Sequence, residues 1–150
     1  HDIFHLLEST RAYMSRRAPR KVVFSFPDFP SGDALMVNVN APLFDWVLEN
    51  LIRNALDAME GKGEIKAEVY EDAENVYIDV TDTGKGMTSG QASKIFRPGW
   101  TTKARGWGLG LSLSKRIIEE YHGGKIFVKK TAPGKGTTFT IRLNKNKEPK

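Results

Sequence analysis

Three glycines at alternate positions, Gly106, Gly108 and Gly110, directly precede a predicted helix. Glycine lets backbone N–H groups approach a ligand closely, and the dipole of a helix favours negative charge at its N-terminal end. The arrangement therefore predicts phosphate binding. The loop alone is weak evidence for a nucleotide, because it lacks the GxGxxG spacing, a directly preceding strand and the GKS or GKT ending of a P-loop.

A carboxylate, Asp82, closes a strand-like run in which Val76, Ile78 and Val80 alternate with other residues. Side chains of a strand point alternately to two faces, so Asp82 is expected on the same buried face as these apolar residues. A buried carboxylate needs hydrogen-bond partners. Taken singly, such an aspartate is also common in turns, and a glycine-containing turn follows it at residues 83–87.

Asn50, Asn54 and Asp57 form a polar stripe within residues 42–59, where apolar residues recur at spacings of three and four. That spacing predicts a helix with one buried face. At about 100° per residue, the three polar side chains lie along one edge of this face. The stripe indicates either a function other than folding or a solvated flank of the helix.

The elements that must position these residues follow from local pattern. We expect a first helix over residues 1–17, two strands at 21–26 and 35–39 paired as a hairpin, and the striped helix with Asn40 as its cap. Two strands then follow, with apolar residues alternating along 65–69 and 76–82, joined by an acidic turn.

A third long helix is expected after the glycine loop, with Leu109, Leu113, Ile117 and Tyr121 on one face. Its end is predicted at Gly123 and Gly124. Two further strands, 125–130 and 137–143, close the domain. Strand alternation directs Thr137 inward with Phe139 and Ile141, and Thr138 to the opposite side.

Composition limits the function. The chain has 150 residues, 39% of them apolar and 27% charged, which is typical of one soluble globular domain. No run approaches the roughly 18 apolar residues of a membrane span. The absence of cysteine excludes disulfides and thiolate chemistry. A net charge of +5 without interleaved aromatic residues does not favour nucleic-acid binding.

Four motifs stand in order along the chain: the striped helix, DTGKGM at 82–87, TTK at 101–103, and GWGLGLSLSKRIIEEYHGG at 106–124. Together they resemble the ATP-binding domain of sensor histidine kinases, within the Bergerat-fold superfamily of gyrase, Hsp90 and MutL. The resemblance runs over nearly the whole chain. It implies an α+β fold, a two-layer sandwich whose mixed sheet of about five strands carries three main helices on one face and an ATP lid.

The resemblance also assigns roles to matching positions. Asn54 is expected to coordinate Mg²⁺ that bridges the ATP phosphates, an ion that prefers hard oxygen ligands. Asn50 would support the phosphates or the water shell of the metal. Asp82 would accept the exocyclic amine of adenine, with Thr137 in the same polar network. The remaining cofactor contacts are expected at Gly84 and Gly86 under the base, at Thr101, Thr102 and Lys103 in the lid, and at Gly106, Gly108, Gly110 and Leu111 around the phosphates.

Three departures from the family pattern are informative. Asn50 stands where the ATPases of the superfamily have a glutamate as general base, so water activation should be poor. Glu49 lies about 100° around the helix from Asn50 and is not favoured as a substitute base. Asp57 replaces a lysine found in many histidine kinases, and Arg53 and Lys103 are candidates to supply the positive charge. The lid carries an altered segment at 97–100.

The implied function is phosphoryl donation from Mg²⁺-ATP to a histidine on a separate helical dimerisation domain, with a response regulator downstream. His1, His5 and His122 are poor acceptor candidates, so we expect residues 1–150 to be one catalytic domain that lacks the phosphoacceptor domain. The domain should work in the cytoplasm without touching a membrane, whether or not its parent protein is anchored. The alternatives are an ATPase or serine kinase of the same superfamily, or a nucleotide-binding module without catalysis.

Overall fold

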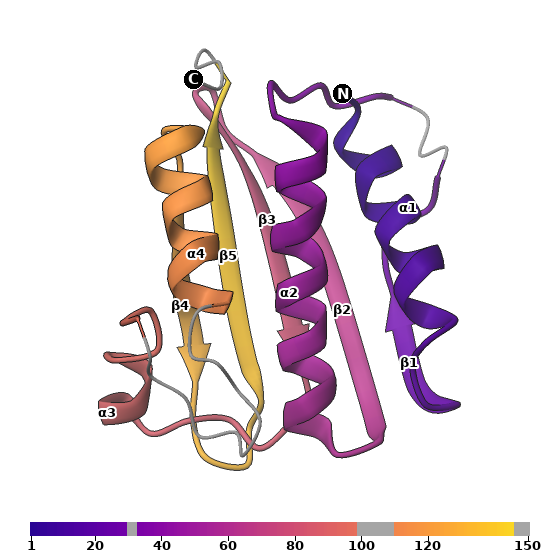
Figure 1. Ribbon diagram of the computed structural model, residues 1–150. Helices are drawn as coiled ribbons and strands as arrows, with labels where there is room; N and C mark the ends of the chain where they lie inside the picture. Colours follow the sequence, from indigo (N-terminus) through magenta and orange to yellow (C-terminus); the bar gives the residue numbers. More distant parts are fainter. Residues whose placement is uncertain (30–32, 99–109, 146–150) are drawn as a thin grey trace.

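One mixed sheet and the helices on one of its faces make up the fold in the computed structural model, which describes residues 1–29, 33–98 and 110–145. Within those residues the sheet has five strands in the order β1-β2-β3-β5-β4. Helices α1, α2 and α4 lie side by side on one face (Figure 1). The predicted α+β two-layer sandwich is therefore confirmed. The elements in chain order are α1 (Ile3–Ser15), β1 (Lys21–Ser25), α2 (Ala41–Met59), β2 (Lys62–Glu71), β3 (Asn75–Asp82), α3 (Ser89–Ala92), α4 (Gly110–Arg116), the π-helix η1 (Ile117–Tyr121), β4 (Lys125–Thr131) and β5 (Thr137–Asn144).

Local signals define the striped helix α2. The side chain of Asn40 caps it by accepting a hydrogen bond from the backbone N–H of Leu43 at 3.0 Å, and Pro42 stands in the first turn, where its missing N–H is not needed. The helix ends where Glu60 takes a left-handed conformation with a φ of 54°. The predicted cap and both predicted ends agree with the structure to within a residue.

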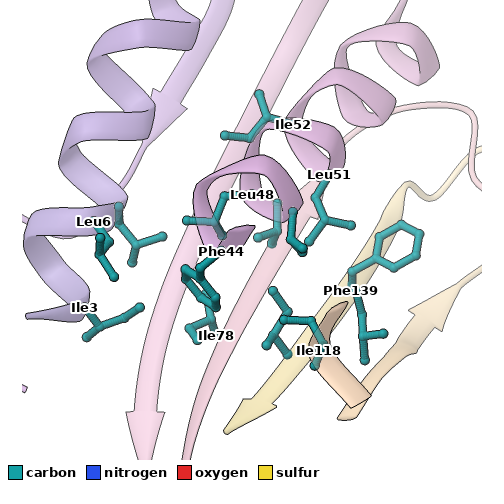
Figure 2. Packing of buried hydrophobic residues seen from close by; sticks show 14 of the residues in the cluster. Ile3, Leu6, Phe44, Leu48, Leu51, Ile52, Ile78, Ile118 and Phe139 are labelled. Carbon is teal, nitrogen blue, oxygen red and sulfur yellow. The ribbon is translucent and has the colours of Figure 1, made fainter. Parts of the chain in front are cut away.

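Helix α2 supplies the centre of the hydrophobic core. Phe44, Leu48 and Leu51 are at most 1% exposed, and they belong to one cluster with residues of the sheet and of the other helices. Figure 2 shows Ile3 of α1 on one side of α2 and Ile118 on the other. Burying each such large apolar side chain contributes about 1.5–3 kcal/mol. Packing of the apolar face thereby fixes the orientation of α2 on the sheet, and with it the position of its polar edge.

The predicted hairpin between residues 21–26 and 35–39 is wrong. Strand β1 instead pairs in parallel with β2, so that Lys21 faces Lys62 across the pair. The second segment forms only an isolated bridge, between Met36 and Asp2. Its backbone is satisfied by the start of α1, where Ile3 N–H donates to the Leu35 carbonyl at 2.9 Å. Alternating apolar residues here reflect packing against a helix rather than strand pairing.

The third helix also differs from its predicted face. Leu113 is 39% exposed, whereas Ser112 and Ser114 are buried. The side of α4 that faces α2 carries Ser114, which bonds to Asn50, and the helix changes from α to π geometry only afterwards, at η1. Ile117 is buried as expected, and Leu109 falls outside the described residues. None of the helices in the described ranges is long and apolar enough to span a bilayer.

The sheet face opposite the helices carries polar side chains, as is common in antiparallel sheets. Asp79 of β3 is 5% exposed. Its Oδ1 accepts a hydrogen bond from the Thr140 hydroxyl at 2.7 Å, and its Oδ2 pairs with Lys129 at 2.9 Å. Thr138 lies on this face too, as predicted, but it is buried, and its hydroxyl lies 2.9 Å from that of Thr81.

Candidate nucleotide-binding site

Asp82 ends β3 on the face covered by helices and is 6% exposed, as its alternation with valine and isoleucine predicts. Its Oδ1 accepts the backbone N–H of Gly84 at 2.8 Å, and the backbone N–H of Thr137 also bonds to the carboxylate. Burial raises the pKa of the Asp82 carboxyl above its ordinary value, and the two N–H groups oppose this shift. The result is a buried hydrogen-bond acceptor in a fixed orientation.

Two turns interlock beside Asp82. An added Cβ on Gly86, whose φ is +64°, would lie 1.9 Å from the carbonyl oxygen of Ala132. An added Cβ on Gly136 would lie 2.0 Å from the carbonyl oxygen of Asp82. The turn 83–87 is also bonded to α2, because the N–H of Lys85 donates to the carbonyl of Ala58 at 3.0 Å. At Gly86 and Gly136, close contact with the backbone of another turn is therefore enough to require glycine.

Gly84 shows the same packing against α2. An added Cβ there would lie 2.6 Å from the carbonyl oxygen of Ala58. The predicted passage of Gly84 and Gly86 beneath a base stays a prediction, because their contacts in the structure are with other parts of the backbone.

Thr137 faces Asp82 in the register of β3 and β5, and it is 6% exposed. Its hydroxyl oxygen lies 2.9 Å from the hydroxyl oxygen of Thr131, the last residue of β4. Thr131 also accepts the N–H of Met87 at 3.0 Å and donates to the carbonyl of Gly136 at 3.1 Å. No sequence pattern singles out Thr131, because its importance depends on the pairing of β4 with β5.

Asn50 of the polar stripe is 7% exposed and faces α4. Its Nδ2 donates to the hydroxyl of Ser114 at 3.2 Å, and that hydroxyl donates to the carbonyl of Gly110 at 2.8 Å. An added Cβ on Gly110 would lie 2.5 Å from Oδ1 of Asn50. Asn50 therefore links α2 to the first residue of α4, where the predicted glycine loop ends. Ser114 was not predicted, because the periodicity of the sequence indicates a different buried face for this helix.

The other two residues of the stripe and the neighbouring Arg53 are less covered. Asn54 is half-buried, and Arg53 and Asp57 are exposed. On α4, Leu111 is half-buried and packs against the hydrophobic core. The C-terminal end of α2, the start of α4 and the end of β3 lie at the same end of the sheet (Figure 1). The predicted contacts Thr101, Thr102, Lys103, Gly106 and Gly108, and with them the lid, lie outside the described residues.

Comparison with known families supports the same reading of these motifs. Residues 40–147 match the family model described as histidine kinase-, DNA gyrase B-, and HSP90-like ATPase. This match covers α2, the Asp82 strand and the helix that follows the glycine loop. The chain belongs to this ATPase family.

Relatives of this ATPase-family domain include sensor kinases. The chain is 46% identical over 100 residues to the sensor histidine kinase ZraS of Escherichia coli K12, a match that covers 67% of this chain and 21% of ZraS. The nucleotide-free catalytic domain of the histidine kinase ThkA has a TM-score of 0.85 at 29% identity, over 97% of this chain and 93% of that one. A complex of ThkA with the response regulator TrrA matches with a TM-score of 0.78 at 26% identity, over 97% of this chain and 41% of that one. The chain thus spans about a fifth of the length of ZraS.

His122 is buried in this ATPase-family domain and has a structural role. The Nε2 of His122 accepts the N–H of Asn40 at 3.0 Å, so Nδ1 carries the proton and donates to the carbonyl of Ile117 at 2.9 Å. Burial lowers the pKa of His122 below its ordinary value, against the hydrogen bond to Ile117. From the sequence, His122 was expected only to be a poor phosphoacceptor. The structure holds it as a neutral ring that joins the end of η1 to the cap of α2.

Proposed function

We propose that this chain is the catalytic, ATP-binding domain of a sensor histidine kinase, which donates the γ-phosphoryl group of Mg²⁺-ATP to a histidine on a separate helical dimerisation domain. The observation that carries the proposal is the buried Asp82 carboxylate, fixed by two backbone N–H groups at the end of the sheet where α2 ends and α4 begins. Family membership and kinase relatives support it.

We propose that Asp82 recognises the adenine base of ATP. A desolvated carboxylate accepts strongly and donates nothing when ionised, which suits the exocyclic amine of adenine. Burial makes such a group costly unless it is paired, and a ligand amine would supply a further partner. Thr137, which faces Asp82 in the strand register and whose backbone N–H bonds to this carboxylate, is proposed to join the same polar network.

The metal is assigned to the edge of α2. When bound, Mg²⁺ would neutralise negative charge on the phosphates of ATP. The half-buried amide of Asn54 is a hard oxygen donor on the stripe, so the residue present fits such an ion in the company of phosphates and water. Arg53 and Asp57 are exposed nearby on the same helix, and we keep them as candidate contacts to the phosphates.

Asn50 distinguishes phosphoryl transfer from hydrolysis. Its Nδ2 donates to Ser114, and an amide cannot take a proton from water at neutral pH. The chain therefore lacks a general base at the position where the ATPases of this superfamily have a glutamate. We infer that ATP survives in the site until a better acceptor arrives. Contacts of the lid and the glycine loop, at 101–103 and 106–111, complete the proposed phosphate site.

The proposed partners follow from the same assignment. The histidine kinase ThkA was crystallised with its response regulator TrrA, which supports a response regulator as the downstream partner of this chain's parent protein. Residues 1–150 are proposed to act as a single catalytic domain, with the phosphoacceptor histidine supplied by the dimerisation domain of that protein. We also propose that this domain acts in the cytoplasm.

The experiment is a transfer assay with ATP labelled at the γ phosphate and the purified dimerisation domain of the parent protein. The proposal expects acid-labile label on the acceptor histidine and slow release of phosphate when the catalytic domain is alone. Asp82→Ala should abolish the labelling. Rapid hydrolysis by the isolated domain would instead support an ATPase, and tight ATP binding without transfer would support a binding module.

A further inference from the structure

The hydroxyl group of Thr131 has three hydrogen-bond partners within the described residues. The N–H of Met87 can only donate to it, at 3.0 Å, and the carbonyl of Gly136 can only accept from it, at 3.1 Å. The third partner is the hydroxyl of Thr137 at 2.9 Å, which can do either. Two of the three directions are therefore fixed by backbone groups.

The direction of the third bond follows from the donor and acceptor capacity of a hydroxyl. A threonine hydroxyl has one proton and two lone pairs. Thr131 gives its proton to Gly136 and one lone pair to Met87, so its remaining lone pair must accept the proton of Thr137. The hydroxyl of Thr137 is thus left with lone pairs only. Thr137 is buried, so its hydroxyl keeps this orientation, because any other orientation would leave a hydrogen-bonding group unpaired.

The consequence concerns the corner formed by Asp82 and Thr137. These residues face each other in the strand register, and the Thr137 N–H bonds to the Asp82 carboxylate. The carboxylate accepts hydrogen bonds when ionised, and the Thr137 hydroxyl is restricted to accepting as well. A ligand that presents an amine fits this corner, whereas one that presents a carbonyl oxygen meets two acceptors and no donor.

We propose that Thr131 is a specificity-determining positioning residue: by taking the proton of Thr137, it makes the base site favour a 6-aminopurine over a 6-oxopurine. Thr131 acts through Thr137 and need not touch the nucleotide. The inference rests on the proposed function, because it assumes that the base lies at Asp82. It adds a residue and a mechanism of discrimination to that site.

Removing the Thr131 hydroxyl frees the proton of Thr137. The freed proton can donate to Asp82, where it competes with the ligand amine, or to the 6-oxo group of guanine, which it would stabilise. Both outcomes reduce the preference for adenine over guanine. A purely structural role of Thr131 in holding the turn at Met87 and Gly136 would instead weaken both nucleotides to the same extent.

The test compares dissociation constants for ATP and GTP, measured by calorimetry, in the unmodified chain and in two variants. Thr131→Val removes the hydroxyl at nearly constant volume, and Thr131→Ser retains it. We expect Thr131→Val to reduce the ATP-over-GTP preference about tenfold. Thr131→Ser should keep this preference within about twofold of that of the unmodified chain. Equal weakening of both nucleotides by Thr131→Val, or no change in either, would overturn the inference.

Thr137→Val keeps the inference testable if Thr131→Val does not fold. It removes the acceptor itself, so the preference for ATP should also fall, and adding Thr131→Val to a folded Thr137→Val variant should not change the preference again. An unchanged preference in Thr137→Val contradicts the inference. Failure of the unmodified chain to bind either nucleotide would instead overturn the proposed function, and the inference with it. ATP binding with an unaltered preference in the variants overturns the inference alone.

Discussion

The carboxamide of Asn50 occupies the space that a side chain on Gly110 would need. An ideal Cβ on Gly110 would lie 2.5 Å from Oδ1 of Asn50 and 3.0 Å from its Nδ2. The same amide is held by Ser114, one turn further along α4. Helices α2 and α4 therefore fit together through one polar contact, and the predicted glycine of the phosphate loop also serves helix packing.

Gly110→Ala should lower the free energy of unfolding by about 1–2 kcal/mol, because overpacking against the buried Asn50 outweighs the gain in helix propensity. Asn50→Ala makes room for the new methyl group. In that background the same substitution should be neutral or stabilising, so a double-mutant cycle by chemical denaturation should give a coupling above about 1 kcal/mol. Equal effects in the two backgrounds would show that the two residues do not compete for space.

Ser114→Ala should leave the buried Nδ2 of Asn50 without its partner. Loss of such a bond typically costs about 1–3 kcal/mol, which denaturation by urea can measure. Ser93→Ala is the matched control: Ser93 is exposed and likewise donates its hydroxyl to a backbone carbonyl, that of Gly90. The control should change stability by less than about 0.5 kcal/mol. Similar losses in both variants would argue against a special role for Ser114.

Gly86→Ala should destabilise the turn beside Asp82 far more than Gly134→Ala. Both glycines have positive φ, of 64° and 76°, so alanine is strained at either position. Only at Gly86 does the added Cβ meet another group, the Ala132 carbonyl oxygen at 1.9 Å, whereas nothing lies within 4 Å at Gly134. We expect a difference of about 2 kcal/mol or more in thermal or chemical unfolding. Equal losses would mean that the two turns separate easily.

Stability should fall with pH below about 6.5 because of His122. Its pKa is lowered in the folded protein by burial, so the unfolded chain binds a proton that the folded chain does not. The free energy of unfolding therefore declines as pH falls from the unfolded pKa and levels off below the folded pKa. His122→Gln should remove this part of the pH dependence, although it lowers stability at neutral pH. The exposed His5 provides the control, since His5→Gln should retain the decline.

Local pattern was enough to predict the centre of the fold. The periodicity of α2, its Asn40 cap and the alternation that buries Asp82 are all encoded in neighbouring residues, and each agrees with the structure. The same alternation placed Thr137 inward beside Asp82. The resemblance to histidine kinases added the roles of the site residues, which stay predictions until nucleotide binding is measured.

The features that were not predicted depend on distant contacts. The parallel pairing of β1 with β2 joins segments separated by the whole of α2, so no local pattern reveals it. Leu113 is exposed because the side of α4 that faces α2 carries Ser114, which bonds to Asn50. Ser114 acquires its importance from Asn50 of α2, and Thr131 from the turn at Met87, both of which are remote in sequence.

The most direct test of the account is the affinity of the chain for ATP, measured by titration calorimetry before and after Asp82→Asn. Loss of the charged acceptor should weaken ATP binding about 10- to 100-fold, while the thermal midpoint of unfolding stays the same or rises because a buried charge is removed. Asp79→Asn is the control, a second buried aspartate on β3 that points to the opposite face of the sheet, and any folded sample should keep its ATP affinity. Unchanged ATP affinity in Asp82→Asn would contradict the placement of the base at Asp82.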